Sequence, residues 1–228
     1  MFIQTKVDIL ARLIGAAVDG ADRETRYYLN GVHVRRSPVA AGVICEATNG
    51  HILALEHDFV GSCSENNAHS LVIPRDTVAA IVREAKLNAK NLAVNWRDQV
   101  VRVTSTGFSF ADTAAFPAKG FIDCSFPECQ RVIPQIKRAN EPGFAGQMNA
   151  RLVWQLLETA GAQEIERDRK AFPYQLFADR KSDSPVVVAV PGRPNWLGVI
   201  MPMRQAAHLP DPRPTWLFPP APKAVAAE

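Results

Sequence analysis

The sequence predicts an α+β fold in which helices pack on antiparallel strands. Three segments, at about 6–18, 75–87 and 150–160, have the apolar spacing of amphipathic helices. The segments between them read as short strands joined by tight turns, which is typical of antiparallel rather than parallel sheet. The helix centres lie roughly 70 residues apart, which indicates a repeated unit of one helix and three or four strands.

Each predicted helix has end signals. Thr5 is placed to cap the first helix, with Asp8 completing a capping-box pattern and Gly20 as a stop. The second helix follows Pro74. Asn149 is the candidate cap of the third, and Gly161 fits the position just after its last turn.

The strands between the helices pair as hairpins. Segments 43–45 and 52–55 flank Asn49-Gly50, a turn pair that tolerates positive φ and strongly predicts a hairpin. Segments 92–96 and 100–103 flank Arg97-Asp98-Gln99 and predict a second one. Further strands are expected at 108–110, 174–177, 185–190 and 197–201.

The composition is that of an ordinary globular protein. The chain has 228 residues, of which 47% are hydrophobic and 21% charged, with a net charge of +3. No secretory signal and no run of about 18 apolar residues occurs, so we expect a cytoplasmic protein with reduced thiols and no membrane partner. The four cysteines lack zinc-site spacing, and we expect them to be small buried residues.

No catalytic motif is present. The sequence lacks a phosphate-binding glycine loop, a Gly-x-Ser-x-Gly elbow and a His-Glu-x-x-His motif, and its five histidines share no metal-ligand spacing. We therefore expect no catalytic residues, no metal and no cofactor. Basic residues on the polar sides of the helices could attract phosphate, although ordinary solvated helix faces explain this spacing at least as well.

Five short motifs occur in a fixed order. They are YYLNG at 27–31, ATNGH at 47–51, IPR at 73–75, FP with RVIP at 126–134, and VIMPMR at 199–204. In these motifs the chain resembles the bacterial DNA polymerase III β subunit, the sliding clamp. The resemblance runs through most of 3–134, which is similar to the middle domain of the clamp, and resumes at 199–204, which closes the last domain in that family.

The resemblance implies a DNA-clamp fold and a ring around double-stranded DNA, with helices lining the hole. Contacts to the phosphates would be independent of sequence, as sliding requires. The DNA-facing residues implied are Arg12, Arg23, Arg26, Tyr27, Tyr28, Arg83, Lys86 and Arg151. The implied function is that of a replication processivity factor in the cytoplasm, associated with the nucleoid.

The resemblance also implies an apolar groove that binds short Leu/Phe peptides of polymerases, clamp loaders or repair proteins. Flexible methionines would let one groove accept several partners. The implied groove residues are Leu29, Thr48, Gly50, His51, Leu53, Pro127, Arg131, Val132, Ile200, Met201, Pro202, Met203 and Arg204.

The chain departs from the family in its domains. We expect a clamp domain at 1–135, a partial one at 136–206 and a Pro-rich disordered tail at 207–228 that contains the apolar Trp216-Leu217-Phe218. Twelve helical units line a familiar clamp, so three units per chain suggest a homo-oligomer of four. Two alternatives stay open: a monomeric peptide-binding module that competes for clamp partners, and a clamp-fold enzyme, which the lack of catalytic motifs disfavours.

Overall fold

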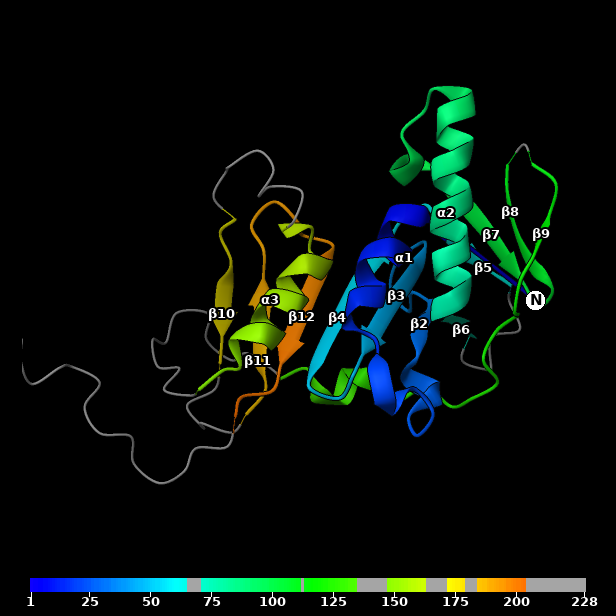
Figure 1. Ribbon diagram of the computed structural model, residues 1–228. Coiled ribbons are helices and arrows are strands. Elements are labelled where there is room, and N and C mark those ends of the chain that lie inside the picture. Colours follow the sequence, from blue (N-terminus) through cyan, green and yellow to red (C-terminus); the bar gives the residue numbers. More distant parts are fainter. Residues whose placement is uncertain (65–70, 112, 135–146, 163–171, 179–183, 204–228) are drawn as a thin grey trace, which may run out of the picture.

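The computed structural model describes residues 1–64, 71–111, 113–134, 147–162, 172–178 and 184–203. Three helices, α1 (Val7–Leu13), α2 (Arg75–Leu92) and α3 (Ala150–Thr159), lie on one side of the strands. Figure 1 shows α1 between the other two helices, and α1 contacts both of them.

The strands form two antiparallel sheets. The seven-stranded sheet has the order β10-β11-β12-β4-β3-β2-β6, and the five-stranded sheet has the order β5-β1-β7-β8-β9. The strands are β1 (Phe2–Lys6), β2 (Gly31–Arg36), β3 (Val43–Thr48), β4 (Ile52–Asp58), β5 (Ser62–Cys63), β6 (Leu71–Pro74), β7 (Val100–Thr104), β8 (Gly107–Phe110), β9 (Phe116–Pro117), β10 (Gln175–Phe177), β11 (Val186–Ala189) and β12 (Trp196–Ile200).

The predicted repeat is confirmed, with one strand added before the helix. The first unit is β1-α1-β2-β3-β4 and the second is β6-α2-β7-β8-β9. These two units exchange their leading strands, because β6 pairs with β2 and β1 pairs with β7. In the third unit, α3 is followed by β10-β11-β12, and β12 pairs with β4 of the first unit. The α+β class and the antiparallel pairing are as the sequence predicts.

The start of the first helix differs from the prediction. Thr5 lies in β1, and its hydroxyl donates to Asp58 Oδ2 at 2.7 Å instead of capping α1. Lys6 is the residue before the helix and makes no side-chain cap. The α-helix is also shorter, since it ends at Leu13 and continues as the 3-10 turn η1 (Ile14–Ala16). The capping-box prediction was wrong because a carboxylate about 50 residues away takes the Thr5 hydroxyl.

The second helix runs further than expected. It reaches Leu92 and ends at Ala93, which adopts a left-handed conformation with φ of 53°. The predicted strand at 92–96 is therefore absent, and Trp96–Asp98 form the 3-10 turn η4. The second half of this hairpin prediction is correct, because β7 follows at Val100–Thr104.

The third helix and the first hairpin are confirmed. The Asn149 side chain accepts from the backbone N of Arg151 at 3.0 Å, and Gly161 follows the helix with φ of +93°. Strands β3 and β4 pair around Asn49-Gly50. Strong local signals were sufficient at both places.

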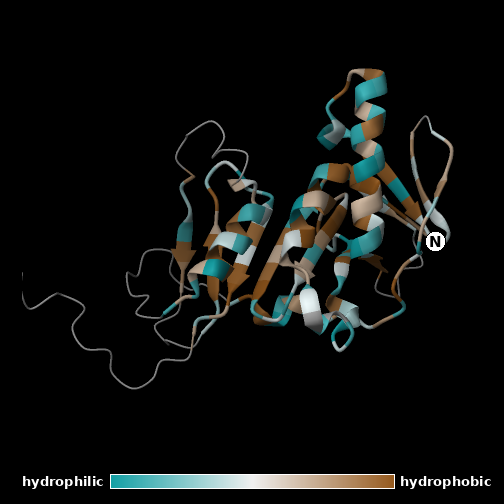
Figure 2. Ribbon diagram, viewed as in Figure 1, coloured by the Kyte–Doolittle hydropathy of each residue, from teal (hydrophilic) through white to brown (hydrophobic). Residues whose placement is uncertain are grey.

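Apolar side chains form two clusters on opposite faces of the seven-stranded sheet. The main core lies between the sheets and the helices, and the strands carry most of the hydrophobic colouring in Figure 2. A second cluster, here called the outer cluster, contains Val18, Leu29, Leu53, Val72, Phe126, Cys129, Val187 and Val199. Its strand residues alternate with those of the main core, so they face away from the helices.

The remaining expectations concern the domain boundary, the C-terminal tail, the cysteines and the membrane. The boundary expected near residue 135 and the tail at 207–228 fall outside the described residues. Cys45 and Cys129 are buried as predicted, whereas Cys63 and Cys124 are half-buried. No helix among the described residues is both long and apolar enough to cross a membrane.

Candidate functional site

The two segments at 47–55 and 199–203 come together at the junction of β4 and β12. Leu53 pairs with Val199 and Ile52 pairs with Ile200. Beyond the last pair, the backbone N of Met201 donates to the His51 carbonyl at 2.9 Å. The junction therefore joins the first structural unit to the third.

The turn at 48–52 is held by its own side chains. The Asn49 Oδ1 accepts from the backbone N of His51 at 2.9 Å and of Ile52 at 3.0 Å. The Thr48 hydroxyl donates to the Ile52 carbonyl at 2.7 Å and accepts from the Gly50 N at 3.1 Å. Gly50 has φ of +89°, a conformation that costs a residue with a Cβ atom extra energy. The turn thus presents His51 on a fixed backbone.

The outer cluster lies beneath this junction. Leu53 is in register with Val199, and Val199 with Val187, so three neighbouring strands place apolar side chains on one face. Phe126 covers part of this face, with its ring stacked on His33 at 4.4 Å between centroids. Burial, reinforced by Glu46, raises the pKa of Cys129 to about 12, so its thiol stays neutral.

Exposed residues surround the buried floor. Leu29, Thr48 and Leu53 are buried, whereas Gly50, His51, Pro127, Arg131, Val132, Met201 and Met203 are exposed and Pro202 is half-buried. Val132 and Arg131 belong to the 3-10 turn η5 (Cys129–Val132). A cavity of about 550 Å³ lies beside Met201 and Met203.

One predicted groove residue has a different place. Ile200 is fully buried in the main core, on the helix side of the sheet. The prediction that it forms a groove wall was wrong because strand residues alternate between faces, and its neighbour Val199 takes the outer position. Arg204 falls outside the described residues.

A trough with a volume of about 1270 Å³ lies between the three helices. Arg83 and Lys86 of α2 line it and are exposed, and Arg83 pairs with Glu84 at 3.0 Å. Lys86 Nζ lies 5.1 Å from the centre of the Trp96 ring. Arg151 is exposed at the start of α3. These three predicted DNA-facing residues carry their charge on the surface.

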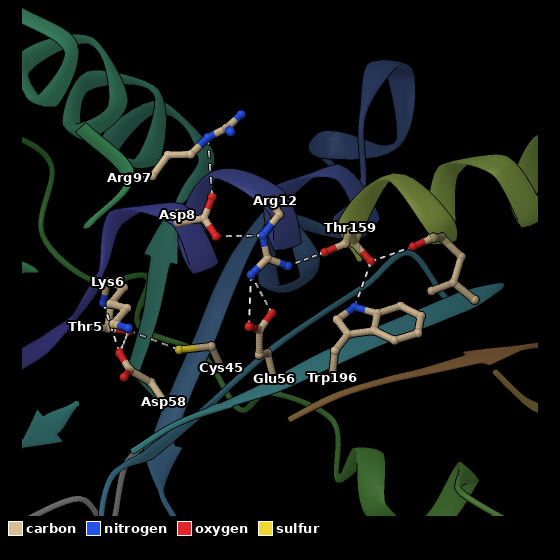
Figure 3. A network of polar contacts seen from close by, with 11 residues as sticks. Thr5, Lys6, Asp8, Arg12, Cys45, Glu56, Asp58, Arg97, Thr159 and Trp196 are labelled. Atoms are coloured by element: carbon tan, nitrogen blue, oxygen red, sulfur yellow. Dashed lines mark hydrogen bonds and ion pairs between the residues drawn. The ribbon is translucent and has the colours of Figure 1, made fainter. Parts of the chain in front are cut away.

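Arg12 is among the residues that the sequence predicts to face DNA. In the structure, however, its charge is not free. Figure 3 shows its guanidinium enclosed between three acceptors: Asp8 at 2.9 Å, Glu56 at 2.7 Å and the Thr159 carbonyl. Burial lowers the pKa of Arg12, but the Glu56 and Asp8 carboxylates outweigh burial and raise it overall. The positive charge of Arg12 is therefore paired with acceptors within the protein. The spacing of polar residues along α1 could not reveal that Glu56 of β4 and Thr159 at the end of α3 are partners of Arg12.

The remaining predicted DNA-facing residues lie near the turn at 48–52. Arg26 is exposed and its Nη1 donates to the Asn49 carbonyl at 3.2 Å. Tyr27 is exposed, Tyr28 is half-buried, and their rings meet edge to face at 5.8 Å. Arg23 lies in the 3-10 turn η2 (Gly20–Arg23). Arg75, at the start of α2, donates to the carbonyls of Ile14, Ala17 and Val18.

A family model decides the relationship of the chain. The model of the DNA polymerase III beta subunit, central domain, matches residues 4–128, which is more than half of the 228 residues. The chain belongs to the DNA polymerase III beta subunit family. No curated protein matches the sequence significantly.

Solved structures of bacterial clamps share the fold of this beta-subunit relative. One structure of the sliding clamp of Caulobacter crescentus matches at 24% identity and a TM-score of 0.56, over 90% of this chain and 65% of that chain. The Helicobacter pylori clamp, bound to a DNA ligase peptide, matches at 10% identity and a TM-score of 0.60 over 89% and 66%. The Bartonella birtlesii clamp, bound to griselimycin, matches at 17% and 0.56 over 90% and 66%. The chain thus has the sliding-clamp fold and spans about two thirds of the length of these clamps.

Sequence reasoning missed several residues of this candidate site. Val187 and Val199 contribute to the floor, and Asn49 locks the turn. Leu152 and Gln155 of α3 line the cavity beside Met201. The apolar runs at 185–190 and 197–201 indicated strands, but they do not alternate, so identifying the two valines as floor residues required the strand order. Among the described residues, no group of three or more His, Cys, Asp or Glu is placed to hold a metal.

Proposed function

We propose that this chain is a sliding-clamp-like processivity factor and acts by binding rather than by catalysis. Its groove at the β4–β12 junction binds short Leu/Phe peptides of a polymerase, clamp loader or repair protein. Its helical face lies toward double-stranded DNA, which it encircles as an oligomer. DNA contacts are made to phosphates without reading the bases.

The observation that carries this proposal is the meeting of two distant segments at one junction. The bond from Met201 N to the His51 carbonyl, at 2.9 Å, places both segments of the groove beside the buried Leu53 and Val199. An apolar floor with a partly polar rim is the arrangement that short peptides with apolar anchors recognise. The Helicobacter pylori clamp, which shares the fold, is bound to a DNA ligase peptide.

Peptide binding is tested with a fluorescein-labelled peptide that carries Leu and Phe anchors, by fluorescence anisotropy. In Met203→Asp, we expect binding to be at least about tenfold weaker, because a charge would have to be desolvated beside apolar anchors. The Met203 side chain is 48% exposed, so the variant should fold.

The matched control is Val39→Asp, which also introduces a charge at an exposed apolar residue, outside the lining of the cavity beside Met203. It should bind the peptide as the wild type does. Equal affinity of wild type and Met203→Asp would contradict the assignment of the groove.

The ring is tested separately, because the chain covers only 65% of the Caulobacter crescentus clamp. Size-exclusion chromatography with light scattering should give a mass of four 25.0 kDa chains, and the protein should stay on circular but not on linearised DNA. A stable monomer that still binds the peptide would favour the alternative, a peptide-binding module that competes for clamp partners.

A further inference from the structure

The trough between the three helices has an unusual lining for a surface that only slides on phosphates. Its sides combine cations from α2 with aromatic rings from η4 and α3. Two small residues, Ala11 of α1 and Gly15 of η1, are also among the lining residues. Apolar atoms of Ala79 and Val82 are open to it as well.

Trp154 of α3 is the most accessible ring in the trough. Its side chain is 45% exposed. The indole Nε1 donates to Glu158 Oε1, one turn along the helix, at 2.9 Å. This bond satisfies the polar edge of the ring and fixes its orientation, so the exposed ring surface is apolar and preorganised for a flat partner.

Trp96 provides a second ring with cations beside it. Lys86 Nζ and Arg97 Cζ each lie 5.1 Å from the centre of this ring. Trp96 is half-buried against the main core, so its position is fixed by packing. Arg83, the other exposed cation of α2, lines the same trough.

Aromatic rings cannot stack on the bases of duplex DNA, because paired bases are already stacked inside the helix. They suit unpaired bases, each of which has an open π-face that can stack on an indole while nearby cations bind the phosphates. We infer that the trough binds single-stranded DNA, with an unpaired base stacked on Trp154 and phosphates bound by Arg83 and Lys86. This inference rests on the proposed DNA-facing role of the helices.

The test compares three probes of equal length: single-stranded oligo(dT), an abasic strand that has the same phosphates but no bases, and a duplex. Binding of the labelled probes to the full chain is measured by fluorescence anisotropy at fixed salt. We expect oligo(dT) to bind about tenfold more tightly than the abasic strand, as one or two stacked bases would produce. Trp154→Ala should remove that difference, and Trp154→Phe should retain most of it.

The matched control is Tyr174→Ala, because Tyr174 is 43% exposed and does not line the trough. It should leave the preference for oligo(dT) unchanged. Equal binding of oligo(dT) and the abasic strand by the wild type would overturn the inference. If the duplex still bound in that case, the proposed DNA-facing role would stand. Loss of duplex binding as well would count against both.

Discussion

Among the contacts that join the third structural unit to the first, two differ clearly in chemistry. On the helix side, the buried Arg12 guanidinium is enclosed by Asp8, Glu56 and the Thr159 carbonyl, so its charge is paired within the protein. At the other place, Met201 bonds to His51 and exposed methionine side chains surround the contact. The first junction is closed and holds the units together, whereas the second leaves apolar side chains exposed, and it is there that we propose a partner binds. The charge of Arg12 thus has a structural part, whereas we propose that the apolar segment at 199–203 takes part in binding.

Removing the charge at the closed junction should have the largest effect. Arg12→Met leaves the buried Glu56 carboxylate without its partner, and we expect a loss of about 3–5 kcal/mol in the free energy of unfolding. Urea denaturation followed by circular dichroism measures it. Arg83→Ala is the control, because Arg83 is exposed, and it should change stability by less than about 1 kcal/mol. Similar free energies of unfolding for the two variants would contradict the assignment of Arg12 as a structural residue and of Arg83 as a surface residue.

A smaller effect is expected at the turn of the open junction. Gly50→Ala forces a residue with a Cβ atom into φ of +89°, and we expect a loss of about 1–2 kcal/mol together with weaker peptide binding. Gly192→Ala is a matched control, because Gly192 has φ of +86° and nothing within 4 Å of an added Cβ atom. It should lose similar stability without losing affinity for the peptide. Affinity lost equally in both variants would mean that the turn at 48–52 has no special part in binding.

The smallest effect concerns the helical face. Lys86→Ala should weaken duplex DNA binding modestly and lower the slope of log affinity against log salt by about 1, because one phosphate contact is lost. Titrations at several salt concentrations measure the slope. Arg36→Ala, which removes an exposed charge from β2 outside the trough, should leave the slope unchanged. Equal slopes for the wild type, Lys86→Ala and Arg36→Ala would show that Lys86 does not contact a DNA phosphate.

The sequence predicted elements that depend on local signals. Helix α3 follows from the Asn149 cap and from Gly161, and the hairpin of β3 and β4 follows from Asn49-Gly50. Two of the errors came from partners far along the chain. Thr5 bonds to Asp58 and Arg12 to Glu56, so both polar side chains are buried although their spacing indicated a cap and a solvated face.

The meeting of segments 47–55 and 199–203 was anticipated through their motifs, whereas the faces on which their side chains lie were not. Whether Val199 or Ile200 faces away from the helices depends on which side of the sheet the helices cover. The segment 197–201 has four apolar residues and one glycine, so its sequence does not show which residues lie on which face of the strand. The contribution of Val187 could be foreseen only by knowing that β11 lies next to β12.

The central claim is that the open junction between β4 and β12 binds peptides. The most direct measurement is photo-crosslinking of a Leu/Phe peptide that carries a photoreactive group, followed by mass spectrometry of the attached residues. We predict attachment at His51, Val132, Met201 or Met203. Attachment at residues of the trough, such as Lys86 or Trp154, would contradict this account.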